Sequence, residues 1–201
     1  MVVENNKYNN LWTDLLKSKG HYLDEEDNSL FKNIFEQRLV NKGEFFIKEG
    51  DKSTEIGFVA EGLFRAYYID LKGNDVTKYF YPEGRTLFSY VSYLTQKAST
   101  YDIQAIENST ILVAKASEVE KAMDGNYQLL LVYKKLLDEV LIMKEEHAGS
   151  FKLLDSTERY IQFLKSNPGL EERVKQHQLA SYLGVTPVSL SRIRKKLNII
   201  K

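Results

Sequence analysis

A basic segment near the C-terminal end carries the residues whose types and spacing point most directly to a chemistry. Ser189, Arg192 and Lys196 recur at steps of three and four, which places them on one face of a helix. Residues 174–201 contain six basic and no acidic side chains. Guanidinium and ammonium groups neutralise phosphates, and arginine is the commonest reader of guanine. The pattern therefore predicts binding to double-stranded DNA.

The elements that must position these side chains are two short helices joined by a tight turn. Gly184 suits a left-handed turn, Thr186 suits a helix N-cap, and Pro187 suits the first helical position. An apolar stripe then follows on the other face: Leu190, Ile193 and Leu197. A generic helical hairpin with a solvated basic face is the alternative to this helix-turn-helix reader. The residues expected to contact DNA are Thr186, Pro187, Val188, Ser189, Ser191, Arg192, Arg194, Lys195 and Lys196.

The net charge of the whole chain gives no indication of this basic module. The chain has 201 residues with 28 basic and 28 acidic side chains. Residues 1–151 hold 18 basic and 24 acidic side chains, a net of −6, and residues 152–201 hold 10 and 4, a net of +6. A neutral total is thus a cancellation, which favours a polyanion-binding module attached to a second part.

Composition excludes several classes of protein. There is no cysteine, so disulfides, cysteine-ligated zinc, iron–sulfur clusters and thiol catalysis are all excluded. No apolar run approaches the roughly 20 residues of a membrane span, and the N-terminal stretch does not resemble a secretory signal. No metal-ligand cluster, phosphate loop or nucleophile–base pair is recognisable. We expect a cytoplasmic protein that is not an enzyme, has no membrane partner and needs no cofactor.

Short helices are expected first. Apolar residues recur at helical spacing over residues 1–37, and the acidic run Asp24–Asp27 suits a helix start. The two stripes are Leu11, Trp12, Leu15 and Leu16, then Leu30, Phe31, Ile34 and Phe35.

Residues 38–116 then change to β-branched and aromatic stretches that alternate with turn signals. Turns at intervals of roughly 8–12 residues predict an antiparallel sandwich or barrel. The expected strands are Glu44–Lys48, Ile56–Ala60, Leu63–Ile69, Val76–Tyr81, Tyr101–Ile106 and Thr110–Ala114.

Residues 117–149 become helical again and carry a heptad seam. The seam has steps of 4, 3, 4, 3 and 4: Leu129, Tyr133, Leu136, Val140, Met143 and His147. A second stripe lies on a neighbouring face: Leu130, Leu137 and Leu141. Two apolar stripes need two partners, so the first is assigned to a homodimer interface. A single helix buried within one protomer is the alternative.

Three domains follow from this organisation. Residues 1–116 form N-terminal helices and a β region, residues 117–149 a dimerisation helix, and residues 150–201 the DNA-binding helices. Within the last part, one helix ends at Asn167-Pro168-Gly169 and another lies around Val174–Leu183.

Over residues 30–197 the chain resembles the CRP/FNR family of bacterial transcription regulators. The run Leu190–Leu197 looks like the family's recognition helix. Four turns look like its β-roll: Lys42-Gly43-Glu44, Lys48-Glu49-Gly50-Asp51, Val59-Ala60-Glu61-Gly62-Leu63 and Tyr81-Pro82-Glu83-Gly84. The resemblance implies an α+β fold: a cyclic-nucleotide-binding-like jelly roll, a long dimerisation helix and a winged-helix-type helix-turn-helix. It also implies a homodimer on a palindromic site, with RNA polymerase as a further partner. Since the sequence stops at Lys201, a reduced or absent wing is expected.

The effector pocket departs from the family's cyclic-AMP binders. Those proteins carry Gly-Glu followed by Arg-Ser or Arg-Thr, whereas this chain has Ser89-Tyr90 and Ser99-Thr100. A buried cyclic phosphate without a guanidinium partner is costly, so the effector is expected to be a small molecule other than cyclic AMP. The candidate pocket residues are Tyr79, Tyr81, Phe88, Ser89, Tyr90, Tyr93, Ser99, Thr100 and Tyr101.

Several alternatives stay open for this pocket. It either holds an aromatic or apolar effector or is filled by its own side chains. Haem sensing needs an axial ligand, and none of His21, His147 and His177 falls in the β-roll. The alternative for the whole chain is a cyclic-nucleotide sensor module whose output is not DNA binding.

Overall fold

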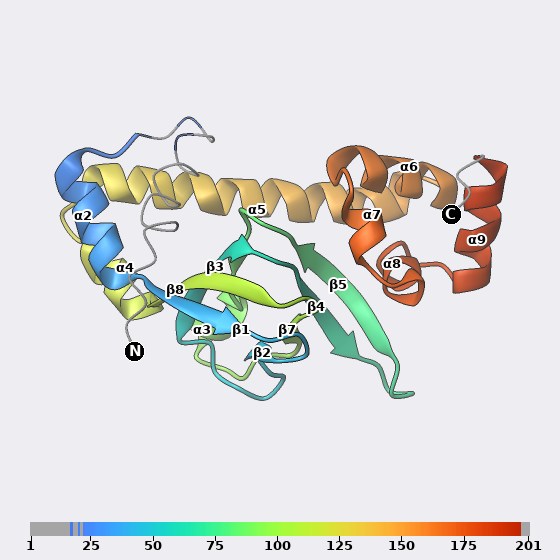
Figure 1. Ribbon diagram of the computed structural model, residues 1–201, viewed down its shortest axis with the longest axis horizontal. Coiled ribbons are helices and arrows are strands. Elements are labelled where there is room, and N and C mark those ends of the chain that lie inside the picture. Colours follow the sequence, from blue (N-terminus) through green and yellow to red (C-terminus); the bar gives the residue numbers. More distant parts are fainter. Residues whose placement is uncertain (1–16, 18–19, 21, 198–201) are drawn as a thin grey trace. The chain divides into compact units, whose positions relative to one another are not determined.

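The computed structural model describes Lys17, Gly20 and residues 22–197 (Figure 1). The predicted stripe Leu11–Leu16 and the expected position of a wing after residue 197 lie outside the described residues. In chain order the elements are α2 (Glu25–Ile34), β1 (Glu36–Val40), β2 (Phe45–Ile47), β3 (Glu55–Glu61), β4 (Phe64–Ile69), β5 (Asp75–Tyr81), β6 (Thr86–Leu87), α3 (Tyr90–Thr95), β7 (Asp102–Ala105), β8 (Ser109–Lys115), α4 (Ala116–Met123), α5 (Tyr127–Leu153), α6 (Ser156–Ser166), α7 (Leu170–Arg173), α8 (Gln176–Tyr182) and α9 (Pro187–Lys196). The α+β fold is confirmed.

Helix α2 begins where the acidic run predicted. The carboxylate of Asp24 accepts a hydrogen bond from the backbone N–H of Asp27 at 2.8 Å, which satisfies a donor of the first turn. The helix ends at Ile34, so Phe35 falls outside it and Glu36 opens β1. Sequence analysis missed β1, because its polar residues face solvent and give no clear alternation.

Two four-stranded sheets form the β-roll. Their strand orders are β1-β8-β3-β6 and β2-β7-β4-β5, and β8 pairs antiparallel with both β1 and β3. Six of the seven β8 residues are buried, as the apolar run Thr110–Ala114 requires of a central strand. Gly57 of β3 leaves room for Phe46, since a Cβ there would lie 2.8 Å from the Phe46 ring. Strand β6, with two residues, was too short to predict.

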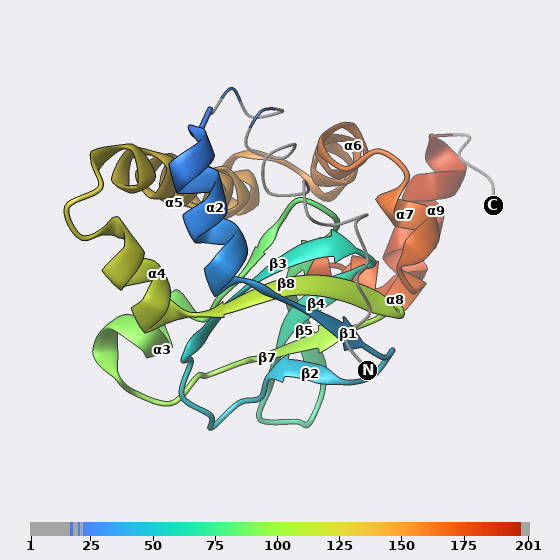
Figure 2. The ribbon, with the colours of Figure 1, turned by 60° about the vertical axis from the view of Figure 1, so that its left-hand side comes forward.

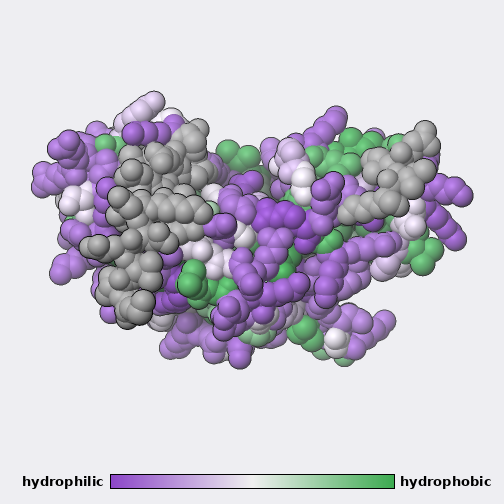
Figure 3. All heavy atoms as spheres, viewed as in Figure 1, coloured by the Kyte–Doolittle hydropathy of each residue, from purple (hydrophilic) through white to green (hydrophobic). Residues whose placement is uncertain are grey.

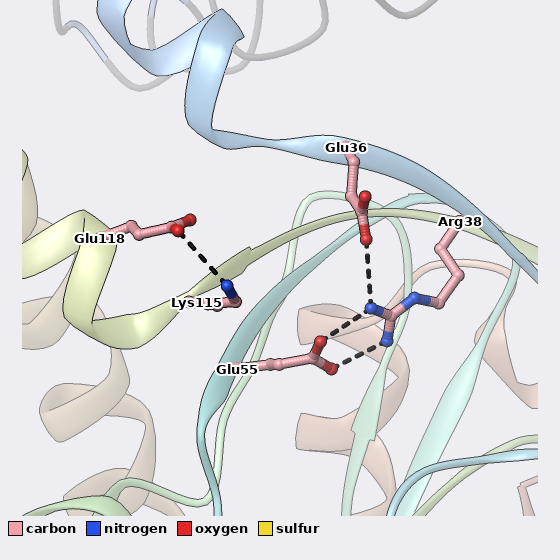
Figure 4. A network of polar contacts seen from close by, with 5 residues as sticks. All are labelled: Glu36, Arg38, Glu55, Lys115 and Glu118. Atoms are coloured by element: carbon pink, nitrogen blue, oxygen red, sulfur yellow. Dashed lines mark hydrogen bonds and ion pairs between the residues drawn. The ribbon is translucent and has the colours of Figure 1, made fainter. Parts of the chain in front are cut away.

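An ionic network joins β1 to β3 within the first sheet (Figure 4). Arg38 of β1 makes two hydrogen bonds of 2.8 Å to the carboxylate of Glu55 on β3, and Glu36 lies 3.4 Å from the same guanidinium. Because β8 lies between β1 and β3, this pair bridges strands that do not pair directly. Lys115 and Glu118 are a further exposed pair at 3.6 Å.

The described chain divides into two compact units. The first comprises Met1–Arg65 with Tyr81–Asp138, and the second comprises Ala66–Phe80 with Glu139–Lys201. Most of the β4–β5 hairpin therefore belongs to the second unit, together with the C-terminal helices. The domain limits expected from the sequence, at 116 and 149, stay predictions.

The long helical region consists of two helices. Helices α4 and α5 are separated at Gly125, which has a φ of +74°, and α5 continues to Leu153. In the first unit, α2, α4 and the start of α5 lie together beside the β-roll (Figure 2). Leu129 and Val132 of α5 are buried in one cluster with Phe58 and Leu112 of the sheet.

This packing reassigns part of the predicted dimer seam. The side chain of Leu129 is fully covered by its own chain, so it has no surface left for a partner. Leu136 packs against the same cluster. Other apolar side chains of α5 are exposed instead, among them Leu130, Leu141 and Ile142, at 49%, 59% and 57%. In the second unit, hydrophobic side chains reach the surface over α6 and the adjoining end of α5 (Figure 3), where Phe151 and Leu153 are exposed.

Candidate nucleic-acid interface and effector pocket

The turn between α8 and α9 has the geometry that the sequence predicted. Gly184 adopts a φ of +68°, a conformation that only glycine takes readily. The Thr186 hydroxyl accepts a hydrogen bond from the backbone N–H of Ser189 at 3.1 Å, and Pro187 stands in the first helical turn. The N-cap, the proline position and the turn glycine are confirmed.

The inner faces of the two helices form a small closed core. Leu179 and Ala180 of α8 and Leu190 of α9 are fully buried, and Ile193 is 8% exposed. Leu197 follows the end of α9 and is only partly buried. Ala180 is small where α8 and α9 approach each other, as the sequence suggested. This core fixes which face of α9 is turned to solvent.

Arg194, which the sequence analysis expected to contact DNA, lies in the interior of these helices. Its guanidinium lies 2.7 Å from the Glu171 carboxylate of α7, and its side chain is only 11% exposed. The Tyr160 hydroxyl of α6 donates to Glu171 at 2.7 Å and accepts from Arg194 Nε at 3.2 Å. An arginine committed to a buried carboxylate positions α9 and does not reach a phosphate.

Arg159 of α6 joins the ends of two other helices. Its Nη1 donates to the carbonyl of Leu154 at 2.8 Å, just after α5, and its Nε donates to the carbonyl of Leu183 at 3.1 Å, just after α8. Carbonyls at helix ends lack partners within the helix, so one guanidinium satisfies both termini. The Arg159 guanidinium also lies 4.8 Å from the Phe151 ring centroid.

The β4–β5 hairpin contacts α8 within the second unit. The backbone N–H of Thr77 donates to the Ser181 hydroxyl at 2.9 Å. The ring of Phe80 lies 5.5 Å from that of Tyr182, and His147 stacks on Tyr182 at 4.6 Å. Burial and the nearby Arg159 lower the pKa of His147. The predicted seam residue His147 is therefore part of an aromatic cluster of its own chain.

The solvent face of the α8–α9 helix pair carries a hollow of about 590 Å³. Its lining residues come from both helices: Gln176, His177, Pro187, Val188, Ser191, Arg192 and Lys195. Arg192 and Lys195 are exposed, as a role in DNA contact requires. Lys196 is exposed but does not line the hollow. The Thr186 and Ser189 hydroxyls lie 2.9 Å apart and bond to each other at the cap.

Two members of this hollow were missed by sequence analysis. Gln176 and His177 open α8, and Gln176 Nε2 donates to the Pro187 carbonyl at 2.9 Å. They precede the helix-turn-helix pattern in the chain, so only the crossing of the helices brings them to α9. The one sequence signal for them was that two polar residues, Gln176 and His177, precede the apolar residues of α8.

Two buried serine hydroxyls of the predicted effector pocket bond to each other. The Ser89 and Ser99 hydroxyls lie 3.1 Å apart and both residues are buried. Ser99 also donates to the Tyr101 carbonyl at 2.8 Å. The neighbouring Thr100 is exposed. These serines thus bond to each other and to the backbone, with no charge of their own to offer a phosphate.

Several predicted pocket aromatics pack against the chain's own core. Phe88 and Tyr93 contact the buried cluster of Ile56, Ala114, Ala116 and Val119. Burial and a hydrogen bond with Glu120 raise the pKa of Tyr93 to about 12. Burial, with Tyr90 nearby, likewise raises the pKa of Tyr133 of α5 to about 12. These contacts favour a pocket region filled at least partly by its own side chains.

Two further tyrosines of the predicted pocket are buried but belong to different units. Tyr81 is 9% exposed and lies in the first unit, whereas Tyr79 lies in the second, with its ring 5.4 Å from that of His147. Sequence reasoning also missed Arg65 of β4, which is only 2% exposed. A charged residue within the apolar run Phe64–Tyr67 was the signal for it.

The described residues offer neither a metal-binding cluster nor a membrane-spanning helix. No group of three or more histidine, aspartate or glutamate side chains in the part described by the structure is arranged to hold a metal ion. Among the same residues, no helix is both long and apolar enough to cross a membrane.

Comparison with known proteins identifies the first part of the chain. Residues 37–126 match the cyclic nucleotide-binding domain family. No curated protein sequence matches the chain.

Solved structures cover most of the chain. FixK2 from Bradyrhizobium japonicum is 18% identical with a TM-score of 0.71, covering 82% of this chain and 85% of its own. The catabolite activator protein of Thermus thermophilus is 19% identical with a TM-score of 0.56, covering 92% and 86%. A protein from Eubacterium rectale, described as a transcriptional regulator of the CRP/FNR family, is 16% identical with a TM-score of 0.66, covering 94% and 86%. Residues 37–126 are thus similar to the cyclic nucleotide-binding domain family, and the chain has the fold of CRP/FNR-family transcription regulators.

Proposed function

We propose that this chain is a DNA-binding transcription regulator that reads a palindromic site as a homodimer. The observation that carries the proposal is the hollow on the α8–α9 hairpin, where exposed Arg192 and Lys195 stand on a helix held from behind by a closed core and a buried ion pair. A rigid helix with cations on its outer face suits the major groove and the phosphates beside it.

Dimerisation is supported by the apolar side chains that α5 exposes. Leu130, Leu141 and Ile142 lie on a helix whose other side already covers the β-roll. Two copies joined along α5 would present two α9 helices. Binding then requires the helices to lie about 34 Å apart, one turn of DNA. An interaction with RNA polymerase follows from the likeness to the family and remains a prediction.

The effector is proposed to be a small molecule other than cyclic AMP. The buried Ser89–Ser99 pair offers hydroxyls where a cyclic phosphate needs a cation. Phe88 and Tyr93 reduce the open space further.

The test is a binding titration of the full chain with DNA from the region upstream of the gene that encodes it. Fluorescence anisotropy is measured over a salt series, with and without cyclic AMP. We expect sequence-selective binding that weakens steeply with salt and does not respond to cyclic AMP. Arg192→Ala should relax base selectivity, whereas Lys165→Ala, an exposed lysine of α6, serves as the matched control.

The outcomes separate the alternatives. An absence of selective, salt-dependent binding would contradict the proposal. Cyclic-AMP binding at micromolar concentration without DNA binding would favour a sensor module with another output, in keeping with the domain match over residues 37–126.

A further inference from the structure

The exposed face of α9 changes character along its length. Val188, near its start, is 62% exposed, and Arg192 follows four residues later. Among the described residues from 156 to 197, Val188 is the one large hydrophobic side chain that is exposed. An apolar side chain at the entrance of an otherwise polar reading face gains nothing from water or from phosphates. It gains free energy only from an apolar partner.

Val188 and Arg192 lie on the same face and line the same hollow. Four residues span about 6 Å of helix axis, and base pairs stack about 3.4 Å apart, so the two side chains meet bases about two steps apart. The neighbouring hydroxyls of Thr186 and Ser189 are used in the helix cap. Besides the hydroxyl of Ser191, the chemistries that α9 offers to base edges at this end are a branched apolar group and a guanidinium.

Taking Arg192 as the guanine reader of the proposed function, we propose that Val188 reads the C5-methyl group of a thymine within about two base-pair steps of that guanine. The thymine methyl is the apolar group that the four standard bases display in the major groove, and a bidentate arginine is the usual partner of guanine. The inference rests on the proposed function, because it names the DNA sequence class that the same site selects.

The geometry behind Val188 makes it a rigid reader. Pro187 restricts the backbone immediately before it, and the Thr186 cap begins the helix at that point. Gln176 of α8 holds the Pro187 carbonyl from the other side of the hollow. Recognition of a thymine methyl group needs a rigidly held Val188, because the small free energy of one methyl contact is lost if the side chain can move away.

The experiment removes the methyl group from the DNA without changing its hydrogen bonds. Preferred sites are first selected from a random library with the full chain. Each thymine of the selected half-site is then replaced by deoxyuridine, one at a time, and the affinity is measured for wild type and Val188→Ala. We expect one thymine per half-site at which deoxyuridine weakens wild-type binding about fourfold, the worth of one buried methyl group. The same replacement should change Val188→Ala binding less than twofold.

Two further measurements test the guanine contact and a phosphate contact. Replacing the nearby guanine with 7-deazaguanine should weaken wild-type binding and leave Arg192→Ala unaffected. Lys195→Ala should weaken binding to every probe by a similar factor, as a phosphate contact does. Because Val188 is exposed, its replacement should leave the unfolding midpoint unchanged, so a loss of affinity reports on reading and not on folding.

Two results would overturn the inference and leave the proposed function standing. One is selective binding in which deoxyuridine is neutral at every thymine. The other is a deoxyuridine penalty that persists undiminished in Val188→Ala. A library that yields no preferred site would instead count against the proposed function itself.

Discussion

The C-terminal helices and the β-roll each contain an arginine–carboxylate pair, and the two pairs differ in solvent exposure. Arg194 and Glu171 are 11% and 10% exposed and share a hydrogen bond with Tyr160. Arg38 and Glu55 make two bonds of the same quality, but their side chains are 37% and 33% exposed. Both pairs make contacts of 2.7–2.8 Å, but only the Arg194–Glu171 pair is shielded from solvent.

This difference teaches which pair determines structure. Removing one partner of a buried pair leaves an uncompensated charge, whereas water solvates the survivor of an exposed pair. Arg194 therefore determines how α9 is held against α6 and α7, while Arg38 adds a modest cross-strand tie. The following predictions test or sharpen this contrast, from the largest expected effect to the smallest.

Replacement of Arg194 should have the largest effect on stability. Arg194→Ala leaves Glu171 buried without its cation, and we expect a loss of about 3 kcal/mol in the free energy of unfolding. Urea unfolding monitored by circular dichroism measures it. Lys195→Ala, on the exposed face of α9, is the control and should leave the stability within about 0.5 kcal/mol of wild type. A variant at 194 that keeps its stability but loses DNA affinity would restore the role that the sequence suggested.

Gly184→Ala should be the next most severe change. A Cβ at this position would lie 2.6 Å from the Phe151 ring, on a backbone with a φ of +68°. Backbone strain alone costs about 1–2 kcal/mol, and the ring must also move. Gly169→Ala is the matched control, because its φ is +77° and nothing lies within 4 Å. Thermal unfolding of both variants isolates the contribution of Phe151, and equal losses would show that the ring adjusts without cost.

Thr186→Ala should cost about 1 kcal/mol through loss of the α9 N-cap. Thr186→Ser keeps the accepting hydroxyl and should remain near wild type. The free energies of unfolding from urea titrations give the comparison. If both variants lose the same amount, the methyl group of Thr186 matters more than the cap.

The exposed pair should show the smallest effect, and it should depend on pH. Arg38 lowers the pKa of Glu55 in the folded protein, so the pair adds stability above the unfolded pKa of about 4.3. That stability disappears as the pH falls through the lower folded value. Glu55→Gln should therefore cost less than about 1 kcal/mol at pH 7, and the cost should shrink as the pH falls below the unfolded pKa. Glu36→Gln is the control, since Glu36 is 74% exposed. A gap between wild type and Glu55→Gln that stays constant as the pH is lowered would contradict this account.

Local patterns predicted the helix-turn-helix in detail but the β-roll only in outline. The Gly184 turn, the Thr186 cap and the Leu190–Ile193 stripe depend on residues within a few positions of one another. Strands β1 and β6 were missed because one is polar on its exposed face and the other has two residues. Pairing with β8 and β3 stabilises them, and that pairing involves residues far away in the sequence.

The roles of individual side chains also divide into those set by local sequence and those set by packing between distant residues. The sequence predicted correctly that the segment around α9 is basic, but it could not separate Arg194 from Arg192, since the two lie two residues apart on one helix. Nor could it tell which stripe of α5 covers the chain's own core, because both stripes are apolar. Burial of Leu129 against Phe58 and exposure of Leu141 decide that question.

By itself, then, the sequence determined the basic C-terminal module, its cap and turn, and the likeness of its β-roll to the family, since these depend on composition and short-range spacing. The tertiary structure alone decided which cations are buried and which face solvent, and it brought Gln176 and His177 to the side of Val188 and Arg192. The physical reason is that solvent exposure and helix crossing depend on what packs behind each residue, and that packing is contributed by distant parts of the chain.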